Sequence, residues 1–198
     1  MNGVLEKAKQ YVVEILSQKL DNEYVYHSLE HTQRVVEKAK ELAKLAKLDE
    51  KRTTLLTIAA WFHDTGFINV AKGHEEESVK IASNFLKNHD LDEEDIQIIS
   101  NLIRVTKLEK QPETELECYI KDADCAYVSS KEYEAYASLL KKEWEATTDL
   151  KYSDREWLKN NIDFIKSHKF YSKIAIKHWG QKKDENISRL LLSYSENK

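Results

Sequence analysis

The sequence predicts an all-α fold, and two observations carry that prediction. The 198 residues include only four glycines and one proline, whereas average usage would give roughly two dozen of the two together. So few chain breakers cannot supply the turns of a β-sandwich or barrel. Apolar residues also recur with the period of an amphipathic helix along the whole chain. The glycines are spaced too widely for a dinucleotide fingerprint or a P-loop.

The first expected helices follow from apolar stripes that are separated by polar breaks. A stripe over residues 5–16 ends before the polar run at 21–23, and a second stripe covers 31–43. The third helix is expected over 49–62, because Asp49 is a suitable start and the chain then reaches Thr-Gly.

The later helices follow the same pattern. A loop over 65–73 precedes a helix over 79–86. Acidic residues open the next helix, over 92–103, where they complement the helix dipole. Pro112 separates it from a helix over 113–129. Shorter amphipathic helices are expected around 133–144, 154–165, 171–179 and 186–194. Without a linker or repeat, we expect one domain over 1–198.

Charge and cysteine content narrow the class of protein. Thirty-one Lys and Arg against thirty-five Asp and Glu give a net charge of −4 without the basic stripe of a nucleic-acid binder. Cys118 and Cys125 are too few for a disulfide framework, and we expect both to be reduced and buried. The longest apolar stretch, Leu55 to Phe62, is far short of a membrane span, and charge follows Met1 too soon for a signal peptide. The expected location is the cytoplasm, with neither a membrane nor a nucleic acid as partner.

Three residues in the first half are candidate metal ligands. His31 lies on the apolar stripe of its helix, one turn before Val35, where a histidine is either a core residue or a ligand. His63 and Asp64 end the most apolar helix. An aspartate near a helix C-terminus needs a compensating cation, which a metal would supply. The alternatives for Asp64 are exposure to solvent and an ion pair with a lysine.

Asp124 is the fourth candidate. Apart from Lys121, the residues that share its helix face are apolar, so its carboxylate is costly to bury without a cation or hydrogen bonds. The alternative is an ion pair with Lys121, and Asp122 is expected at the charged surface. Two imidazoles and two carboxylates suit Mn²⁺, Fe²⁺, Co²⁺ or Mg²⁺ and leave positions open for water and a phosphate oxygen.

The ordered set of four resembles the H…HD…D signature of the HD-domain metal-dependent phosphohydrolases. The resemblance covers about residues 26–128 and extends more loosely over the helices expected at 131–198. It implies an HD-type helical bundle that binds a divalent ion (Mn, Fe, Co, Ni or Mg), one per chain, with two as the alternative. Asp124 matches, rather than Asp122, because the family's aspartate follows the alanine of an Ala-Asp pair.

The run Tyr-His-Ser-Leu-Glu-His at 26–31 is similar to the YHNxxH opening of cyclic-nucleotide phosphodiesterases. In those enzymes the first histidine protonates the leaving oxygen, so the resemblance implies that His27 is the general acid. Ser28, Thr32 and Arg34 differ from the residues that are usual at their positions in those enzymes.

Two further residues lie near the motifs. His74 follows the loop after Asp64 and is interpreted as a second-metal ligand or substrate contact, with a solvated helix start as the alternative. Lys72 is the first choice for a phosphate contact because it shares the loop with His74; Arg34, Arg104 and Lys121 are the other candidates.

The remaining histidines and aromatic residues are assigned structural roles or none. His89 is expected at a helix end, and His168 and His178 receive no role. The aromatic residues of the C-terminal third are expected in the core, with stacking on a base as the alternative. Gly66 and Gly73 bracket the loop at 65–73, which makes that loop a candidate substrate gate.

The expected function is hydrolysis of a phosphate ester or anhydride in a small molecule, namely a nucleotide. A metal-bound hydroxide would attack phosphorus, while Asp64 orients the water and His27 protonates the leaving group. The choice between monoesterase and diesterase, the native metal and the oligomeric state stay open.

Two other functions also stay open. One is a mixed-valent di-iron oxygenase on the same fold, similar to the inositol oxygenases, although few histidines lie between Asp64 and Asp124. The other is a non-catalytic module that binds a nucleotide. Such a binder has little need for an open metal position, so the intact ligand set favours an enzyme.

Overall fold

The computed structural model describes residues 2–89 and 91–196 and confirms the all-α prediction. The described residues form α-helices and two short 3₁₀-helices, η1 and η2, and contain no strand. In chain order the elements are α1 (Asn2–Lys19), α2 (Leu29–Leu45), α3 (Glu50–Phe62), η1 (Thr65–Ile68), α4 (His74–Lys87), α5 (Glu93–Val105), α6 (Glu115–Asp124), η2 (Cys125–Ser129), α7 (Tyr133–Thr147), α8 (Asp154–Ser167) and α9 (Lys173–Glu196).

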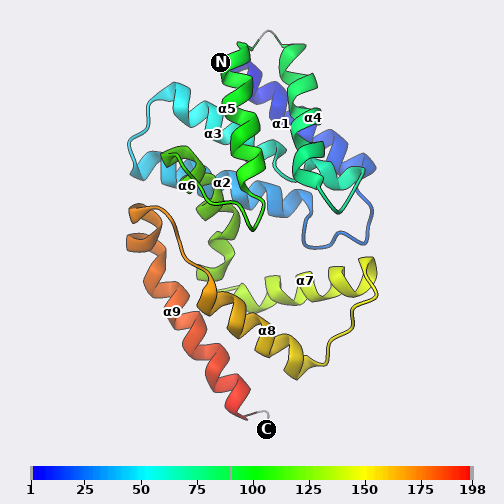
Figure 1. Ribbon diagram of the computed structural model, residues 1–198, viewed down its shortest axis with the longest axis vertical. Coiled ribbons are helices and arrows are strands. Elements are labelled where there is room, and N and C mark those ends of the chain that lie inside the picture. The colour runs from blue at the N-terminus through cyan, green and yellow to red at the C-terminus, as the bar shows by residue number, and fades with distance from the viewer. Residues whose placement is uncertain (1, 90, 197–198) are drawn as a thin grey trace.

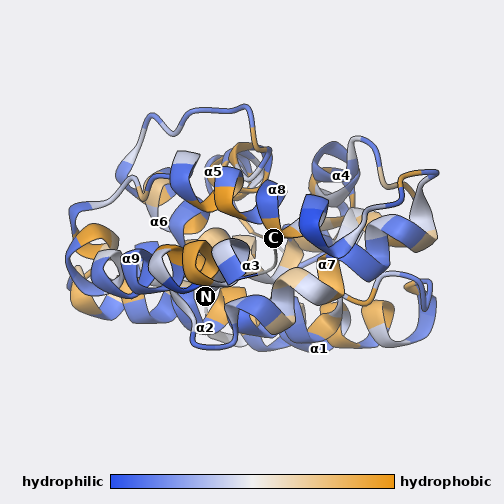
Figure 2. Ribbon diagram, turned by 90° about the horizontal axis from the view of Figure 1, so that it is seen from below, coloured by the Kyte–Doolittle hydropathy of each residue, from blue (hydrophilic) through white to orange (hydrophobic). Residues whose placement is uncertain are grey.

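Helix α3 lies at the centre of the hydrophobic core. All its residues from Thr54 to Phe62 are buried, and it packs against α1, α2, α5 and α6. A helix that is surrounded on every side must be apolar all round, which explains why the longest apolar stretch of the chain lies here. Figure 2 shows the outer helices with apolar faces turned inward and polar faces turned to solvent.

The remaining helices divide into two parts. Figure 1 shows α1 to α6 in the upper part of the molecule and α7 to α9 in the lower part. The short helix η2 joins them and contacts both α7 and α9, while α2 also reaches α9. Asp124, which directly precedes η2, therefore lies where the two parts meet.

Side-chain caps fix the starts of the helices that carry the candidate ligands. The Ser28 hydroxyl accepts a hydrogen bond from the backbone N–H of His31 at 3.5 Å, and Asp49 caps α3. Thr114 begins α6 with a capping box. Each cap satisfies backbone N–H groups that have no partner within the helix, so it determines where the helix begins. His31 is thereby held in the first turn of α2.

Two predicted helix boundaries are wrong. The helices expected at 171–179 and 186–194 form one continuous helix, α9, which passes through Gly180. Glycine costs about 1 kcal/mol inside a helix, but buried Trp179 and Leu190 on either side of it anchor α9 to the core. The helix expected over 113–129 ends at Asp124, and the chain continues as η2.

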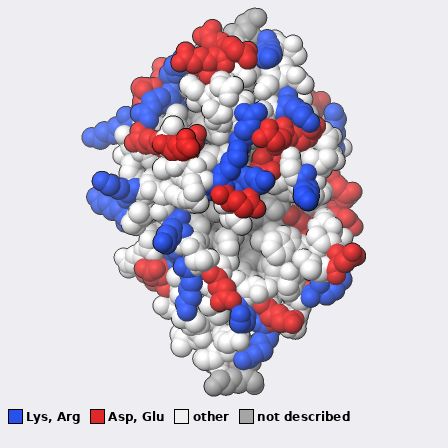
Figure 3. Space-filling view, viewed as in Figure 1, with Lys and Arg blue, Asp and Glu red and all other residues white. Residues whose placement is uncertain are grey.

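The cysteines differ in part from the expectation for them. Cys118 and Cys125 are free, as predicted, but both are partly exposed rather than buried. Figure 3 shows basic and acidic side chains interspersed over one face of the molecule. Among the described helices, none has the length and apolarity to span a membrane.

Candidate metal centre

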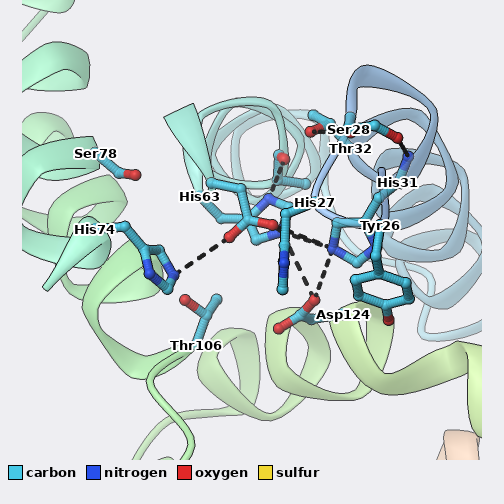
Figure 4. Close-up of polar contacts among 12 residues, drawn as sticks. Tyr26, His27, Ser28, His31, Thr32, His63, His74, Ser78, Thr106 and Asp124 are labelled. Atoms are coloured by element: carbon cyan, nitrogen blue, oxygen red, sulfur yellow. Dashed lines mark hydrogen bonds and ion pairs between the residues drawn. The ribbon is translucent and has the colours of Figure 1, made fainter. Parts of the chain in front are cut away.

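The structure brings the four predicted ligands together. His31 comes from α2, His63 and Asp64 lie between α3 and η1, and Asp124 is the last residue of α6. Figure 4 shows the side chains of His31, His63 and Asp124 pointing toward one another. His31, His63 and Asp64 are buried, whereas 23% of the Asp124 side chain is exposed. The cluster is therefore reachable from the side of Asp124.

Each of the four side chains contributes one polar atom to a compact group. His31 Nε2 lies 3.3 Å from His63 Nε2, 3.3 Å from Asp64 Oδ2 and 3.2 Å from Asp124 Oδ1. His63 Nε2 lies 3.1 Å from Asp64 Oδ2 and 3.6 Å from Asp124 Oδ1. Ligand atoms that share an ion at about 2.1 Å lie roughly 3.0–3.4 Å from one another. The ligand atoms of His31, His63 and Asp124 all lie within 4.8 Å of one another, a group that could hold a metal ion, and Asp64 Oδ2 adjoins the two imidazoles of this group.

The chemistry of the donor atoms also fits an ion. His63 Nδ1 lies 2.9 Å from the carbonyl oxygen of Ala60, so the neutral imidazole donates its proton there and turns the lone pair of Nε2 toward the cluster. Asp64 Oδ2 is buried without a hydrogen-bond partner. Lone pairs that face one another in a buried site repel, and a cation among them would remove that repulsion. Imidazole nitrogen with carboxylate oxygen suits a borderline divalent metal.

The electrostatics of the cluster favour positive charge. Burial by itself would lower the pKa of His63, but the Asp64 and Asp124 carboxylates raise this pKa well above its ordinary value. Burial would raise the pKa of each of these carboxyl groups, but the facing histidines His31 and His63 hold both pKa values below their ordinary range. Both carboxylates are thus ionised and available as ligands.

A comparison with protein families agrees with this geometry. The family model of the HD domain matches residues 28–126, which is half of the 198-residue chain. The chain belongs to the HD-domain family. The resemblance predicted from the sequence is thus confirmed, and the all-α fold is that of the HD domain. No curated protein and no solved structure matches the chain.

Glu143, on α7, is a further residue beside the centre of this HD domain, and it was not predicted. Its buried carboxylate accepts hydrogen bonds from the backbone N–H groups of Tyr26, at 2.8 Å, and His27, at 2.9 Å, and it also pairs with Nδ1 of His27. Burial by itself lowers the pKa of His27, but the hydrogen bond to Glu143 and the charge of Asp64 raise it above its ordinary value. Glu143 stands 116 residues after His27, so no local spacing indicates the pair.

His74 also lies beside the cluster. Its Nε2 is 3.6 Å from Asp64 Oδ1, and its Nδ1 is 2.9 Å from the carbonyl oxygen of Ala71. The ring stacks on Phe67 with centroids 3.9 Å apart, and Phe67 stacks in turn on His27 at 4.5 Å. Phe67, which was not predicted as a site residue, therefore contacts both histidines, whose own ring centroids lie 6.4 Å apart.

The loop that was predicted as a substrate gate is packed in its first half. Thr65 to Phe67 are buried within η1. A Cβ on Gly66 would lie 2.0 Å from the carbonyl oxygen of His74, so glycine is required for η1 to approach α4 this closely. Only the second half of the loop, residues 69–73, is exposed.

The predicted phosphate contacts have different surroundings. Lys72 lies in the exposed half of the loop, and no ion pair joins it to the cluster within the described residues. Arg104 is paired with Glu76 at 3.0 Å. Lys121 is buried, and its Nζ donates to two main-chain carbonyls at and after the end of α5, at 2.9 and 2.7 Å. Burial lowers the pKa of Lys121. No ion pair between Lys121 and Asp124 is found among these residues.

The expectation that Asp122 lies at the charged surface is wrong. Its side chain is fully buried and accepts hydrogen bonds from the backbone N–H groups of Tyr171, at 2.7 Å, and Ser172, at 2.8 Å. Both donors lie in the turn that leads into α9, about 50 residues further along the chain. Asp124 faces the cluster, while Asp122 on the same helix anchors the start of α9.

The aromatic residues of the C-terminal third are core residues only in part. Tyr133 and Trp179 are buried, as expected, whereas Trp144 remains 38% exposed. His89 lies just beyond α4, at a helix end as expected, and stacks on Phe85 with centroids 4.2 Å apart.

Two cavities adjoin helix α6. A cavity of about 730 Å³ has His31, Arg34 and Asp124 in its wall. A second cavity, of about 450 Å³, is lined by Lys121 and His168, among others.

Proposed function

We propose that this protein is a metal-dependent phosphohydrolase that acts on a phosphate ester or anhydride of a nucleotide. Membership in the HD-domain family suggests a metal-dependent, hydrolase-type function. The observation that carries the proposal is the group of donor atoms from His31, His63 and Asp124, which has the spacing of a metal site, with the buried Asp64 carboxylate beside its two imidazoles.

In this proposal the four residues hold one divalent ion per chain. When bound, the ion supplies Lewis acidity, which lowers the pKa of water and neutralises charge on phosphoryl oxygens. Asp64 Oδ1 faces Nε2 of His74 at 3.6 Å, whereas Oδ2 faces the other ligands. The carboxylate of Asp64 is therefore placed both to hold the ion and to orient an attacking water. His74, on the Oδ1 side, is a candidate for a substrate contact or a ligand of a second ion.

His27 is the proposed general acid. Its raised pKa keeps the imidazole protonated at a higher pH than an ordinary histidine, and a protonated ring can donate to a leaving oxygen. Glu143 fixes the orientation of the ring through Nδ1, which leaves Nε2 to transfer the proton. The group with metal-site spacing comprises His31, His63 and Asp124; Asp64 Oδ2 lies within 3.3 Å of both its histidines, whereas the polar contact of the His27 ring is with Glu143.

Two measurements test the proposal. Elemental analysis of the purified protein identifies the bound metal, and a panel of phosphomonoesters, phosphodiesters and nucleotides is then assayed with that metal. His63→Ala and Asp64→Ala should remove bound metal and activity together, because each deletes a ligand. His27→Ala should retain the metal and lose turnover. Metal-dependent turnover that persists in Asp64→Ala would refute the assignment.

The two alternative functions predict different results in the same experiments. Within the described residues one group of His, Asp, Glu and Cys side chains has the spacing of a metal site, which supports a mononuclear centre over a di-iron oxygenase. Two irons per chain with oxygen consumption would favour the oxygenase. Tight nucleotide binding without hydrolysis of any substrate would favour a binding module.

A further inference from the structure

The larger cavity opens onto the candidate metal centre. It lies between α2, η2, α7 and α9, and two of the candidate ligands, His31 and Asp124, form part of its wall. Its volume, about 730 Å³, is within the range of small-molecule sites, which is roughly 300–1,000 Å³. A molecule in this cavity can therefore reach the centre.

Arg34 lies in this cavity, one helical turn after His31. Residues three apart share a helix face, and Arg34 lines the same cavity as His31 and Asp124. Its guanidinium carbon is 4.3 Å from the centroid of the Tyr136 ring. The ring contact occupies the flat face of the guanidinium and holds its plane, but the N–H donors point outward along the edge. Tyr136 thus orients Arg34 without consuming its hydrogen-bonding capacity.

No carboxylate pairs with Arg34 within the described residues, although acidic side chains also line the cavity. The neighbouring cation on the same helix differs, because Lys38 Nζ is 2.7 Å from Oε2 of Glu41. Lys131 and Lys182 also line the cavity but are exposed to solvent. Arg34 is therefore half-buried, oriented and in the same cavity wall as His31 and Asp124, and its donors remain available for an anion.

We propose that Arg34 binds a phosphate oxygen of the substrate, and that the substrate is an organic phosphate whose remaining part occupies the 730 Å³ cavity. This inference rests on the proposed phosphohydrolase function and names the direction from which the substrate reaches the centre. A guanidinium offers two parallel N–H groups that match two oxygens of a phosphate, so it gives orientation as well as charge. Arg34 then takes the role first assigned to Lys72.

The test uses the full chain and inorganic phosphate, which cannot be hydrolysed further. Phosphate binding is measured by calorimetry in the presence of Mn²⁺ for the unsubstituted protein and for Arg34→Met. Methionine keeps an apolar stem over Tyr136 and removes the charge. Lys38→Met is the matched control. It also removes one positive charge from the wall of this cavity, but the charge of Lys38 is already paired with Glu41. Circular dichroism melting checks that each variant is folded.

Arg34→Met should weaken phosphate binding by about tenfold to a hundredfold, the usual range for one lost charged hydrogen bond. The phosphate affinity of Lys38→Met should stay within about threefold of that of the unsubstituted protein. Arg34→Lys should recover part of the lost affinity, since lysine restores the charge but not the two parallel N–H groups of a guanidinium. Equal phosphate binding in Arg34→Met and the unsubstituted protein would overturn the inference, as would a lack of phosphate binding by the unsubstituted protein.

The test also separates this inference from the proposed function. If no phosphate ester is hydrolysed but Arg34→Met still weakens phosphate binding, the anion site stands and the hydrolase proposal fails. If the protein hydrolyses phosphate esters and Arg34→Met changes neither phosphate binding nor the KM, the hydrolase stands and the role of Arg34 is wrong.

Discussion

Glu143→Gln should slow turnover without removing the metal. In the structure one carboxylate oxygen of Glu143 accepts two backbone N–H groups, and the other pairs with Nδ1 of His27. Glutamine keeps the shape but presents an uncharged amide, so the protonated His27 loses the negative charge of its partner. A hydrogen bond to a charged group contributes about 1.5–3 kcal/mol, which corresponds to a fall of roughly 1–2 units in the pKa of His27.

We therefore expect kcat at neutral pH to fall about tenfold to a hundredfold. The pKa of His27 is raised in the native protein, so activity that needs the protonated ring is present at low pH and lost as pH rises through that pKa. In Glu143→Gln the alkaline limb of the pH profile should move to lower pH. The loss should be larger for phenyl phosphate than for p-nitrophenyl phosphate, because the poorer leaving group depends more on protonation.

The control is Glu134→Gln, an equal change of charge at an exposed position of the same helix. Metal content is measured in both variants by elemental analysis. If kcat in Glu143→Gln equals that of the unsubstituted protein for both substrates, Glu143 does not position an acid. If metal is lost along with activity, Glu143 supports the metal centre instead, and the assignment of His27 loses its main structural support.

Two further predictions concern stability. Asp122→Ala removes the acceptor of two backbone N–H groups, so the free energy of unfolding should fall by about 2–4 kcal/mol. For a chain of this size that is very roughly 4–16 °C in Tm. A Tm within 2 °C of the unsubstituted protein (about 0.5–1 kcal/mol) would contradict this reasoning. Burial together with the charge of Lys183 lowers the pKa of His168 to about 4, while an unfolded histidine titrates near its ordinary 6.5. The unfolded chain therefore binds more protons between these values, and the free energy of unfolding should fall by about 2 kcal/mol between pH 7 and pH 5 on this account. In His168→Leu, the free energy of unfolding measured in urea should fall by about 2 kcal/mol less between pH 7 and pH 5 than in the unsubstituted protein. An equal fall in both proteins would show that His168 is not its source.

The candidate ligands could be predicted from the sequence because their signals are local. His31 lies on an apolar helical stripe, and His63 with Asp64 ends an apolar helix, so each stands out within a short window. The order of these signals along the chain was sufficient to indicate the HD-domain family. The helical class followed in the same way from the shortage of glycine and proline.

The unpredicted features depend on contacts between distant parts of the chain. Glu143 acts on His27 across 116 residues, and Asp122 binds a turn about 50 residues further on. An aspartate that is buried by a remote turn has the same local sequence as one at the surface, so Asp122 was misplaced. The sequence predicts two helices around 171–179 and 186–194, whereas α9 is continuous, because the burial that holds it together comes from its packing partners.

The contact between His27 and Glu143 has a consequence for how such a protein can change over evolutionary time. The matched family segment covers residues 28–126, so the candidate metal ligands lie inside it, while both members of this pair lie outside. If His27 is the general acid, its carboxylate partner stands on α7, outside the matched segment, so a substitution in α7 can change leaving-group preference without altering the candidate ligands.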